Sequence, residues 1–321
     1  MHTLPNDTQT GSFKAFPEFS KLTLADRKRY EALIKDYPPV SEIQFPTLMA
    51  WWNDLGSCAV SRLNDSIVLS YWFPGKEKAT GLSVVGTSGI DEAICTVFDY
   101  LRERGDPIRL VHVPEFVLHS VQYPELFIAD PERAFDEYIY DISRFYPLSN
   151  VPPYRRGRIK KFLAEVGEQH IVLKQLDLAS ATDRRLLLDR AAAWRKNDPL
   201  HLNNIAKLEA EAVGTIIEQG QLMGVENLSI FVDGELQGFC CYRIAEDRRY
   251  ALLLGFRIGH EIPRLLDYMA YAFARWFADR GVRYVNLDCD LGLPFLRMFK
   301  VALGPSNYFR KYTIRPAGDR R

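Results

Sequence analysis

Three polar side chains near the C-terminus are candidates for chemistry. Asn286, Asp288 and Asp290 alternate with apolar residues in the segment 283–290, which has the pattern of a β-strand. Because side chains alternate across a strand, we expect the three polar groups on one face. Carboxylates placed in this way can accept a proton from a reacting group or orient it. The same alternation directs Cys289 to the opposite face, so we do not expect a covalent intermediate on its sulfur.

Two cations follow on a predicted helix, residues 293–301. Arg297 and Lys300 are three positions apart and are therefore neighbours on one side of this otherwise apolar helix. Cations in apolar surroundings need anions. Either Asp288 and Asp290 supply them, which makes the cluster structural, or a substrate phosphate or carboxylate does, which makes it a binding site. Both readings stay open, and open α/β sheets usually bind ligands at the carboxyl ends of their strands.

A basic block lies in the middle of the chain. Its cations are Arg155, Arg156, Arg158, Lys160 and Lys161. With Leu163 and Val166 behind it, the block is typical of an amphipathic helix whose charged face projects outward. An isolated basic run is usually a solvated helix face. Between two domains, where clefts form, the same run is suited to phosphate binding.

The elements around these residues occur twice, in the same order, with negligible sequence identity between the two sets. In the first half we expect helices at 24–35 and 45–55, strands at 58–63, 66–73 and 79–85, a helix at 90–104, a strand at 109–113, a helix at 114–121 and strands at 126–129 and 138–142. In the second half we expect a strand at 170–176, helices at 181–196 and 202–219, and strands at 228–232, 236–244 and 250–256. A helix at 262–280, a strand at 283–290, a helix at 293–301 and a strand at 307–314 complete this half. The sequence therefore predicts an α/β fold with mixed sheets: a domain of residues 1–150, a basic connecting helix of residues 151–168, and a similar domain of residues 169–321.

Composition limits the classes of partner. Lys plus Arg and Asp plus Glu both number 41, so the formal net charge is zero, and contact with nucleic acid or membrane must come from a local patch. The five cysteines have no CxxC spacing, which predicts neither a disulfide framework nor a metal site. No apolar run approaches the roughly 20 residues of a membrane-spanning helix. We expect a cytoplasmic protein with at most peripheral contact at the inner membrane face.

Three parts of the chain share the pattern of one known family. They are residues 135–141 (FDEYIYD) leading into 155–162 (RRGRIKKF), residues 286–292 (NLDCDLG) with Arg297, Lys300 and Pro305, and residues 309–312 (FRKY). On these segments the chain resembles the phosphatidylglycerol lysyltransferase C-terminal-like family, from about residue 21 to residue 316. The resemblance implies two tandem GNAT-like acyltransferase domains, related to aminoacyl-phosphatidylglycerol synthases and more distantly to Fem-type aminoacyltransferases.

The resemblance also implies an activity: transfer of an aminoacyl group from aminoacyl-tRNA to a hydroxyl or amine acceptor, often a lipid headgroup, with no cofactor and no metal. Since the donor ester is already activated, such a protein mainly positions the acceptor, takes up its proton and stabilises the oxyanion. Asp288 or Asp290 would accept the proton, and the basic block would meet the tRNA acceptor end or an anionic headgroup. The residues expected to hold phosphate or developing negative charge, or to line the site, are Arg297, Lys300, Lys311, Asn286 and Tyr140.

Two other functions stay open. An acyl-CoA-dependent N-acyltransferase cradles pyrophosphate on the backbone amides of a glycine-rich turn that opens a helix. The turn at 257–263 has one glycine and misses the usual spacing, whereas the turn at 85–89 has two. A non-catalytic module would bind a lipid headgroup, tRNA or a partner protein without turnover. Gly157 within the basic block and the neutral overall charge favour such a module, and the polar cluster at 286–300 weighs against it.

Overall fold

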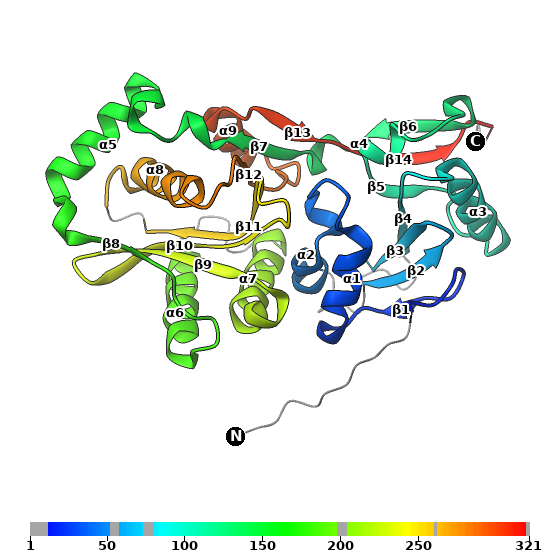
Figure 1. The fold of residues 1–321 in the computed structure, drawn as a ribbon, viewed down its shortest axis with the longest axis horizontal. Helices are drawn as coiled ribbons and strands as arrows, with labels where there is room; N and C mark the ends of the chain where they lie inside the picture. The colour runs from blue at the N-terminus through cyan, green and yellow to red at the C-terminus, as the bar shows by residue number, and fades with distance from the viewer. Residues whose placement is uncertain (1–11, 52–57, 73–79, 198–203, 260–261, 319–321) are drawn as a thin grey trace. The chain divides into compact units, whose positions relative to one another are not determined.

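The computed structural model describes residues 12–51, 58–72, 80–197, 204–259 and 262–318. The chain forms two compact units, each made of discontinuous segments, and Figure 1 shows their elements. Unit 1 consists of Met1–Leu22, Ser57–Asp130 and Thr313–Arg321, and unit 2 consists of Thr23–Gly56 and Pro131–Tyr312. Every predicted site residue belongs to unit 2, whereas the alternative glycine turn at 85–89 belongs to unit 1.

The first sheet belongs to unit 1. Its strands in the described residues are β1 (Ser20–Lys21), β2 (Ala59–Leu63), β3 (Ser66–Trp72), β4 (Thr80–Val85), β5 (Leu110–Pro114), β6 (Phe127–Pro131) and β14 (Lys311–Pro316), in the order β1-β2-β3-β4-β5-β14-β6. The first four are antiparallel, and β5 is parallel to β4. A parallel neighbour needs a crossover connection. Helix α3 (Ile90–Glu103) supplies it and buries Ile94, Val97 and Leu101. The short helix α4 (Glu115–Leu118) follows β5.

The second sheet belongs to unit 2. Its strands in the described part of the chain are β7 (Glu137–Asp141), β8 (Ile171–Lys174), β9 (Glu226–Val232), β10 (Glu235–Ile244), β11 (Tyr250–Ile258), β12 (Tyr284–Asn286) and β13 (Asn307–Phe309), in the order β13-β7-β12-β11-β10-β9-β8. Strands β8 to β11 form an antiparallel meander, and β12 is parallel to β11. Helix α8 (Leu265–Ala278) makes that crossover and covers one face of the sheet, while α6 (Ala181–Asn197) and α7 (Asn204–Met223) cover the other (Figure 1).

The remaining helices of unit 2 come from distant parts of the sequence. The α-helices among them are α1 (Arg27–Ile34), α2 (Phe45–Trp51), α5 (Pro153–Val166) and α9 (Pro294–Leu303), and one of several short 3₁₀ helices, Ser41–Ile43, lies between α1 and α2. Helix α2 packs against α7, and the Tyr30 hydroxyl of α1 donates to the carbonyl of Ile43 at 2.9 Å. The N-terminal segment 23–51 is therefore part of the second unit. None of the helices in the described residues is long and apolar enough to span a membrane.

The two halves of the chain exchange their last strands. In the first half, β6 stays in the first sheet and β7 pairs with β12 in the second. In the second half, β13 pairs with β7 and β14 lies between β5 and β6 in the first sheet. Apart from this exchange the two sheets have the same strand order, which confirms the predicted fold class, α/β with two GNAT-like units in tandem. The exchange and the N-terminal segment 23–56 both make the units discontinuous, so the bounds of the units differ from the predicted division into residues 1–150, 151–168 and 169–321.

Most local predictions agree with the structure. The amphipathic helix predicted at 262–280 is α8, and the basic block lies on helix α5 as expected. The strand predicted at 283–290 is wrong in its second half, because β12 ends at Asn286, and Asp288 and Leu291 have φ values of 60° and 52°. The strand predicted at 307–314 is in fact β13 and β14, which go to different sheets.

Candidate functional site

A loop after β12 carries the segment predicted to be catalytic. Left-handed backbone at Asp288 and Leu291 turns this loop back toward helix α9. Lys300 of α9 holds the loop, since its Nζ donates to the carbonyl oxygens of Leu287 at 2.6 Å, Asp288 at 3.1 Å and Cys289 at 2.5 Å. Lys300 is buried, and burial lowers its pKa although nearby carboxylates act in the opposite direction. All three ammonium hydrogens have protein acceptors, so the geometry gives Lys300 a positioning role.

Asp290 is fully buried and has both carboxylate oxygens occupied. Arg297 Nε donates to Oδ2 at 2.8 Å and its Nη2 to Oδ1 at 3.1 Å. The Tyr138 hydroxyl donates to Oδ2 at 2.6 Å and the Gly292 N–H to Oδ1 at 2.8 Å, with a longer contact of 3.4 Å from Arg133. Burial by itself would raise the pKa of Asp290, but these hydrogen bonds outweigh it and the pKa is lowered. Asp290 is therefore an ionised anchor, poorly suited to take up a proton.

Asp288 is half-buried and lines a cavity. Its Oδ1 accepts hydrogen bonds from Ser41 Oγ at 2.9 Å and from the Cys289 N–H at 2.7 Å. Its own N–H donates to Asn286 Oδ1 at 2.8 Å, which fixes the turn after β12. Within the described residues Oδ2 accepts no hydrogen bond. This second oxygen is available to a ligand in the cavity.

Asp288 is joined to a buried ion network through Ser41. Lys311 Nζ lies 2.7 Å from Glu137 Oε1 and also pairs with Glu42. Glu137 Oε1 accepts from the Ser41 N–H at 2.8 Å, and Asn286 Nδ2 donates to the other carboxylate oxygen of Glu137. Glu137, Asn286 and Lys311 are inaccessible to solvent, and Glu42 is nearly so. The predicted site residues Asn286 and Lys311 thus belong to this network and do not line the cavity.

The Ser41 hydroxyl has more acceptors around it than hydrogens to donate. The Ser41 hydroxyl lies within hydrogen-bond distance of Glu42 (3.0 Å), Glu137 (2.9 Å) and Asp288 (2.9 Å), but it has one hydrogen to donate. Burial, with the charge of Asp288 adding to it, raises the pKa of Glu137 well above its ordinary value. Burial lowers the pKa of Lys311 well below its own. Because the two shifts are in opposite directions, this buried pair can hold a proton on either partner.

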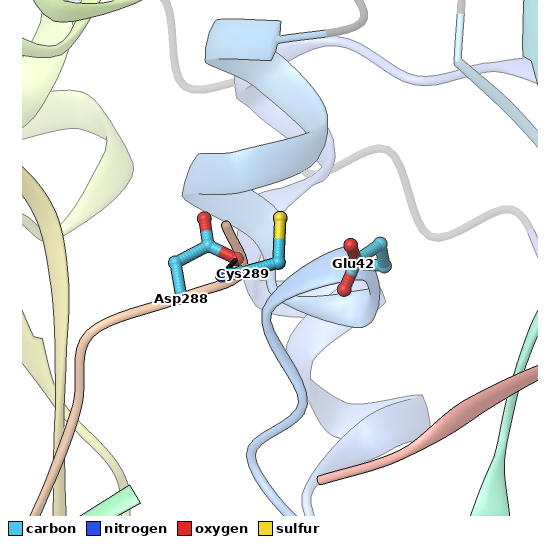
Figure 2. A group of neighbouring side chains, drawn as sticks. All are labelled: Glu42, Asp288 and Cys289. Carbon is cyan, nitrogen blue, oxygen red and sulfur yellow. Dashed lines mark hydrogen bonds between the residues drawn. The ribbon is translucent and has the colours of Figure 1, made fainter. Parts of the chain in front are cut away.

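Three potential ligand atoms gather beside this network, as Figure 2 shows for Glu42, Asp288 and Cys289. Their oxygen and sulfur atoms lie within 4.8 Å of one another, close enough to share a metal ion. The prediction that Cys289 faces away from Asp288 is wrong, because the strand ends at Asn286. Burial and the Asp288 charge raise the pKa of Cys289, and Lys311 already neutralises Glu42. The cluster therefore favours proton chemistry over cation binding, since a metal prefers a thiolate and unpaired carboxylates.

The cavity beside Asp288 has a volume of about 630 Å³ and mostly apolar walls. Asp288, Lys300 and Tyr140 are the predicted site residues that line it. The Tyr140 side chain is buried, and its hydroxyl donates to the Lys300 carbonyl at 2.7 Å. The apolar walls come from α2, the strands β11 and β12, and the helices α8 and α9, and they include Trp51, Leu253, Phe256, Phe273, Leu287, Phe295, Leu296 and Phe299.

Further polar groups interrupt these apolar walls. Thr47 and Arg257 line the cavity, and within the described residues Thr47 Oγ1 and Arg257 Nε are buried without a hydrogen-bond partner. Arg257 Nη2 pairs with Glu209, and the guanidinium lies 4.4 Å from the ring centre of Trp194. Buried polar atoms without partners are costly. Thr47 and Arg257 are therefore positions where a bound ligand would complete the hydrogen bonding.

The basic block has two kinds of cation. Arg155 donates to the carbonyl oxygens of Ala302 at 2.6 Å and Leu303 at 3.3 Å. These hydrogen bonds satisfy carbonyl groups at the C-terminal end of α9, which have no partner within the helix. Arg158 pairs with Asp267 of α8 at 2.6 Å. Arg156 donates to the Ser149 carbonyl at 3.2 Å. Lys160 and Lys161 are exposed, and Lys161 lies 3.9 Å from the carboxylate of Glu165 on the same helix. The arginines therefore attach α5 to its neighbours, and the lysines remain accessible to an anion.

Arg155 and Arg158 also line a smaller cavity of about 220 Å³ among α5, α8 and α9. This cavity shares the wall residues Phe145, Leu266, Ala270, Phe299 and Leu303 with the cavity of Asp288. The predicted basic and acidic sites are thus neighbours across a common apolar wall.

The residues that sequence reasoning missed are Ser41, Glu42 and Glu137. Glu137 lies in the segment 135–141 that carried the family resemblance. A charged residue at the start of a strand rich in aromatic residues was the signal that could have identified it. Ser41 and Glu42 follow Pro38 and Pro39 in an irregular stretch with no periodic pattern. No local sequence pattern indicates that Ser41 and Glu42 contact the loop that carries Asp288, which lies 247 residues after Ser41.

Comparison with known proteins fits this geometry. The family described as phosphatidylglycerol lysyltransferase, C-terminal, matches residues 44–315, which is most of the chain. The chain belongs to this family. As a member of the phosphatidylglycerol lysyltransferase C-terminal family it is an acyltransferase. None of the curated proteins matches it.

Two solved structures have a similar fold. A conserved protein of unknown function from Bacteroides thetaiotaomicron superposes with a TM-score of 0.80 and 19% sequence identity, over 93% of this chain and 99% of its own. The L-PGS structure from Bacillus licheniformis gives a TM-score of 0.59 and 12% identity, over 91% of this chain and 92% of its own. At such identities the likeness establishes the fold alone.

Proposed function

We propose that this chain transfers an aminoacyl group from aminoacyl-tRNA to a hydroxyl or amine acceptor, with an anionic lipid headgroup as the acceptor class. One observation carries the proposal: Asp288 lines a largely apolar cavity, and one of its carboxylate oxygens is joined through Ser41 to the buried network of Glu137 and Lys311. Family membership supplies the acyl-transfer chemistry.

The reaction requires one proton acceptor. The acceptor oxygen or nitrogen attacks the carbonyl carbon of the aminoacyl ester, and its proton passes to Asp288. The tetrahedral intermediate then expels the ribose oxygen of the tRNA, which takes up that proton. The Cys289 N–H donates to Asp288 Oδ1 at 2.7 Å and so orients the carboxylate, and Ser41 Oγ lies 2.9 Å from the same oxygen. Because the ester is already activated, the proposal requires no cofactor.

The surroundings of Asp288 suit both substrates. Apolar walls accommodate hydrocarbon or the aliphatic part of an aminoacyl group, and Thr47 and Arg257 offer donors to oxygens of a substrate. Lys160 and Lys161, exposed on α5, are suited to phosphates of tRNA or of a headgroup. A lipid acceptor implies action at a membrane surface.

A donor test decides among the candidate functions. Purified protein is incubated with radiolabelled aminoacyl-tRNA pools and, separately, with radiolabelled acetyl-CoA, each in the presence of a total lipid extract or a polar metabolite extract. Label passing from tRNA into lipid is the expected result. Label passing only from acetyl-CoA contradicts the proposal and assigns an acyl-CoA-dependent reaction; the glycine turn at 257–263 that would serve it lies partly outside the described residues. No transfer from either donor favours a binding module.

A further inference from the structure

Helix α9 turns an apolar face to solvent. Phe295, Met298, Phe299 and Ala302 have the spacing i, i+3, i+4, i+7 that places them on one side of a helix. Phe295 is 44% exposed, Met298 69% and Phe299 37%, and Val301 beside them is 49% exposed. We call these five residues the α9 apolar face.

The orientation of α9 is fixed by its two charged residues. Arg297 pairs with buried Asp290, and Lys300 is buried against the carbonyls of the loop 287–289. A surface helix normally directs its charges to water and its apolar stripe to the core. In α9 the charges bond to the protein and the apolar stripe is exposed. Contiguous exposed apolar surface of this kind marks an interaction site.

The surroundings of the α9 apolar face are basic. Helix α5 begins beside the end of α9 (Figure 1), where Arg155 donates to the Ala302 carbonyl. Exposed Tyr154 and the exposed lysines Lys160 and Lys161 lie on α5. Neither residues 151–164 nor residues 291–318 contain an aspartate or glutamate. Two carboxylates lie at α5, and both are paired. Asp267 of α8 pairs with Arg158, and Glu165, in the last turn of α5 itself, pairs with Arg264 and lies 3.9 Å from Lys161.

The α9 apolar face is also continuous with the site. Phe295 and Phe299 are partly exposed and line the cavity of Asp288, and Phe299 and Ala302 line the smaller cavity beside Arg155. A surface that covers this face therefore lies directly at the entrance to both cavities.

We propose that the α9 apolar face, together with the cations of α5, docks on an anionic lipid bilayer. Aromatic and Met side chains that insert among acyl chains, with lysines alongside, are the composition of interfacial helices. A second copy of this chain fits less well, since a symmetric contact would bring the two basic helices together. The inference deepens the proposed function by assigning the surface that meets the lipid. It rests on the proposed function for the biological role of this docking, whereas the docking itself can be measured without any acyl transfer.

Vesicle flotation tests the docking surface without any acyl donor. The purified full chain is mixed with vesicles of phosphatidylcholine alone, or of phosphatidylcholine with about one quarter phosphatidylglycerol. We expect binding to the anionic vesicles, and a loss of at least about tenfold when Phe295→Asp and Met298→Asp are combined. Lys160→Gln and Lys161→Gln should weaken binding to anionic vesicles by roughly fivefold each. Leu222→Asp, a similarly exposed apolar position on α7, is the matched control and should bind as the unmodified chain does.

Two results would overturn the inference: no binding of the unmodified chain to anionic vesicles, or full binding by the doubly substituted variant. A dimer in light scattering that the same two substitutions dissociate, without vesicle binding, would assign the α9 apolar face to a second copy. Should the double variant fold poorly, a fluorophore on Met298→Cys, in a Cys95→Ser background, replaces it, and an emission unchanged by anionic vesicles contradicts docking. Since no donor is present, failure of the acyl-transfer test is distinguishable from failure here.

Discussion

Glu137 and Lys311 each begin one of the two strands that the halves of the chain exchange, and their side chains meet at 2.7 Å without access to solvent. Glu137 opens β7, which the first half contributes to the second sheet. Lys311 opens β14, which the second half contributes to the first sheet. The ion pair that supports the candidate site thus forms only when both exchanged strands are in place.

Replacing Asp288 by Asn should abolish turnover while leaving substrate binding intact. The amide cannot take up the acceptor proton, so we expect kcat to fall by about 100- to 10,000-fold with little change in KM. Steady-state transfer of labelled aminoacyl groups measures both constants. Asp279→Asn, at an exposed position after α8, is the matched control. Turnover at the unmodified level in Asp288→Asn would remove Asp288 from the mechanism.

Asp290→Asn should act mainly on stability. The substitution weakens a buried, charge-assisted cluster, and we expect a loss of about 2–4 kcal/mol in the free energy of unfolding. The folded-state pKa of Asp290 is lowered, so its contribution is present above its unfolded value of about 3.9 and is lost as the pH falls through the folded value. Urea denaturation at several pH values should show the difference between the two proteins shrinking below about pH 4. A difference that does not change with pH would contradict this account.

Lys311→Met alone should lower the free energy of unfolding more than the double substitution Lys311→Met with Glu137→Gln does. The single substitution leaves Glu137 and Glu42 buried without their cation, at a cost of about 3–5 kcal/mol. Neutralising Glu137 as well removes one of the two uncompensated charges, so the double variant should recover at least about 1 kcal/mol. A double-mutant cycle by urea denaturation measures the coupling. Strictly additive effects would show that the pair does not interact in the folded protein.

Thr47→Val should raise stability and lower activity. Within the described residues the Thr47 hydroxyl is buried in the cavity wall without a partner, so the isosteric Val should stabilise the protein by about 1 kcal/mol. If the hydroxyl completes its hydrogen bonding with substrate, the same variant should lose about tenfold in kcat/KM. Thermal unfolding and transfer kinetics give the two values, and Thr47→Ser, which keeps the hydroxyl, should retain activity. A Thr47→Val variant that is stabilised and fully active would show that Thr47 only forms part of the cavity wall and does not bind substrate.

Local patterns predicted the elements that depend on short-range periodicity. The helix predicted at 262–280 is α8 because its apolar positions recur every three to four residues and pack on one face of the sheet. The repeated element order likewise indicated two similar units before any contact was known. The alternation at 283–290 misled, because Lys300, from a helix further along the chain, binds three carbonyls of that segment and stabilises a turn in place of a strand.

The sequence by itself determined the two-unit α/β class, the family, and the importance of Asp288, Asp290, Arg297 and Lys300 as a group. Tertiary structure alone decided their separate environments. Asp290 forms an ion pair with Arg297, whereas Asp288 lines a cavity. Ser41 and Glu42, from near the other end of the chain, lie beside Asp288. It also decided that the apolar stripe of α9 is exposed. The physical reason is that periodicity reports which side chains share a face, whereas burial, pairing and pKa depend on what packs against that face, and here the exchanged strands and the N-terminal segment bring those partners from far along the chain.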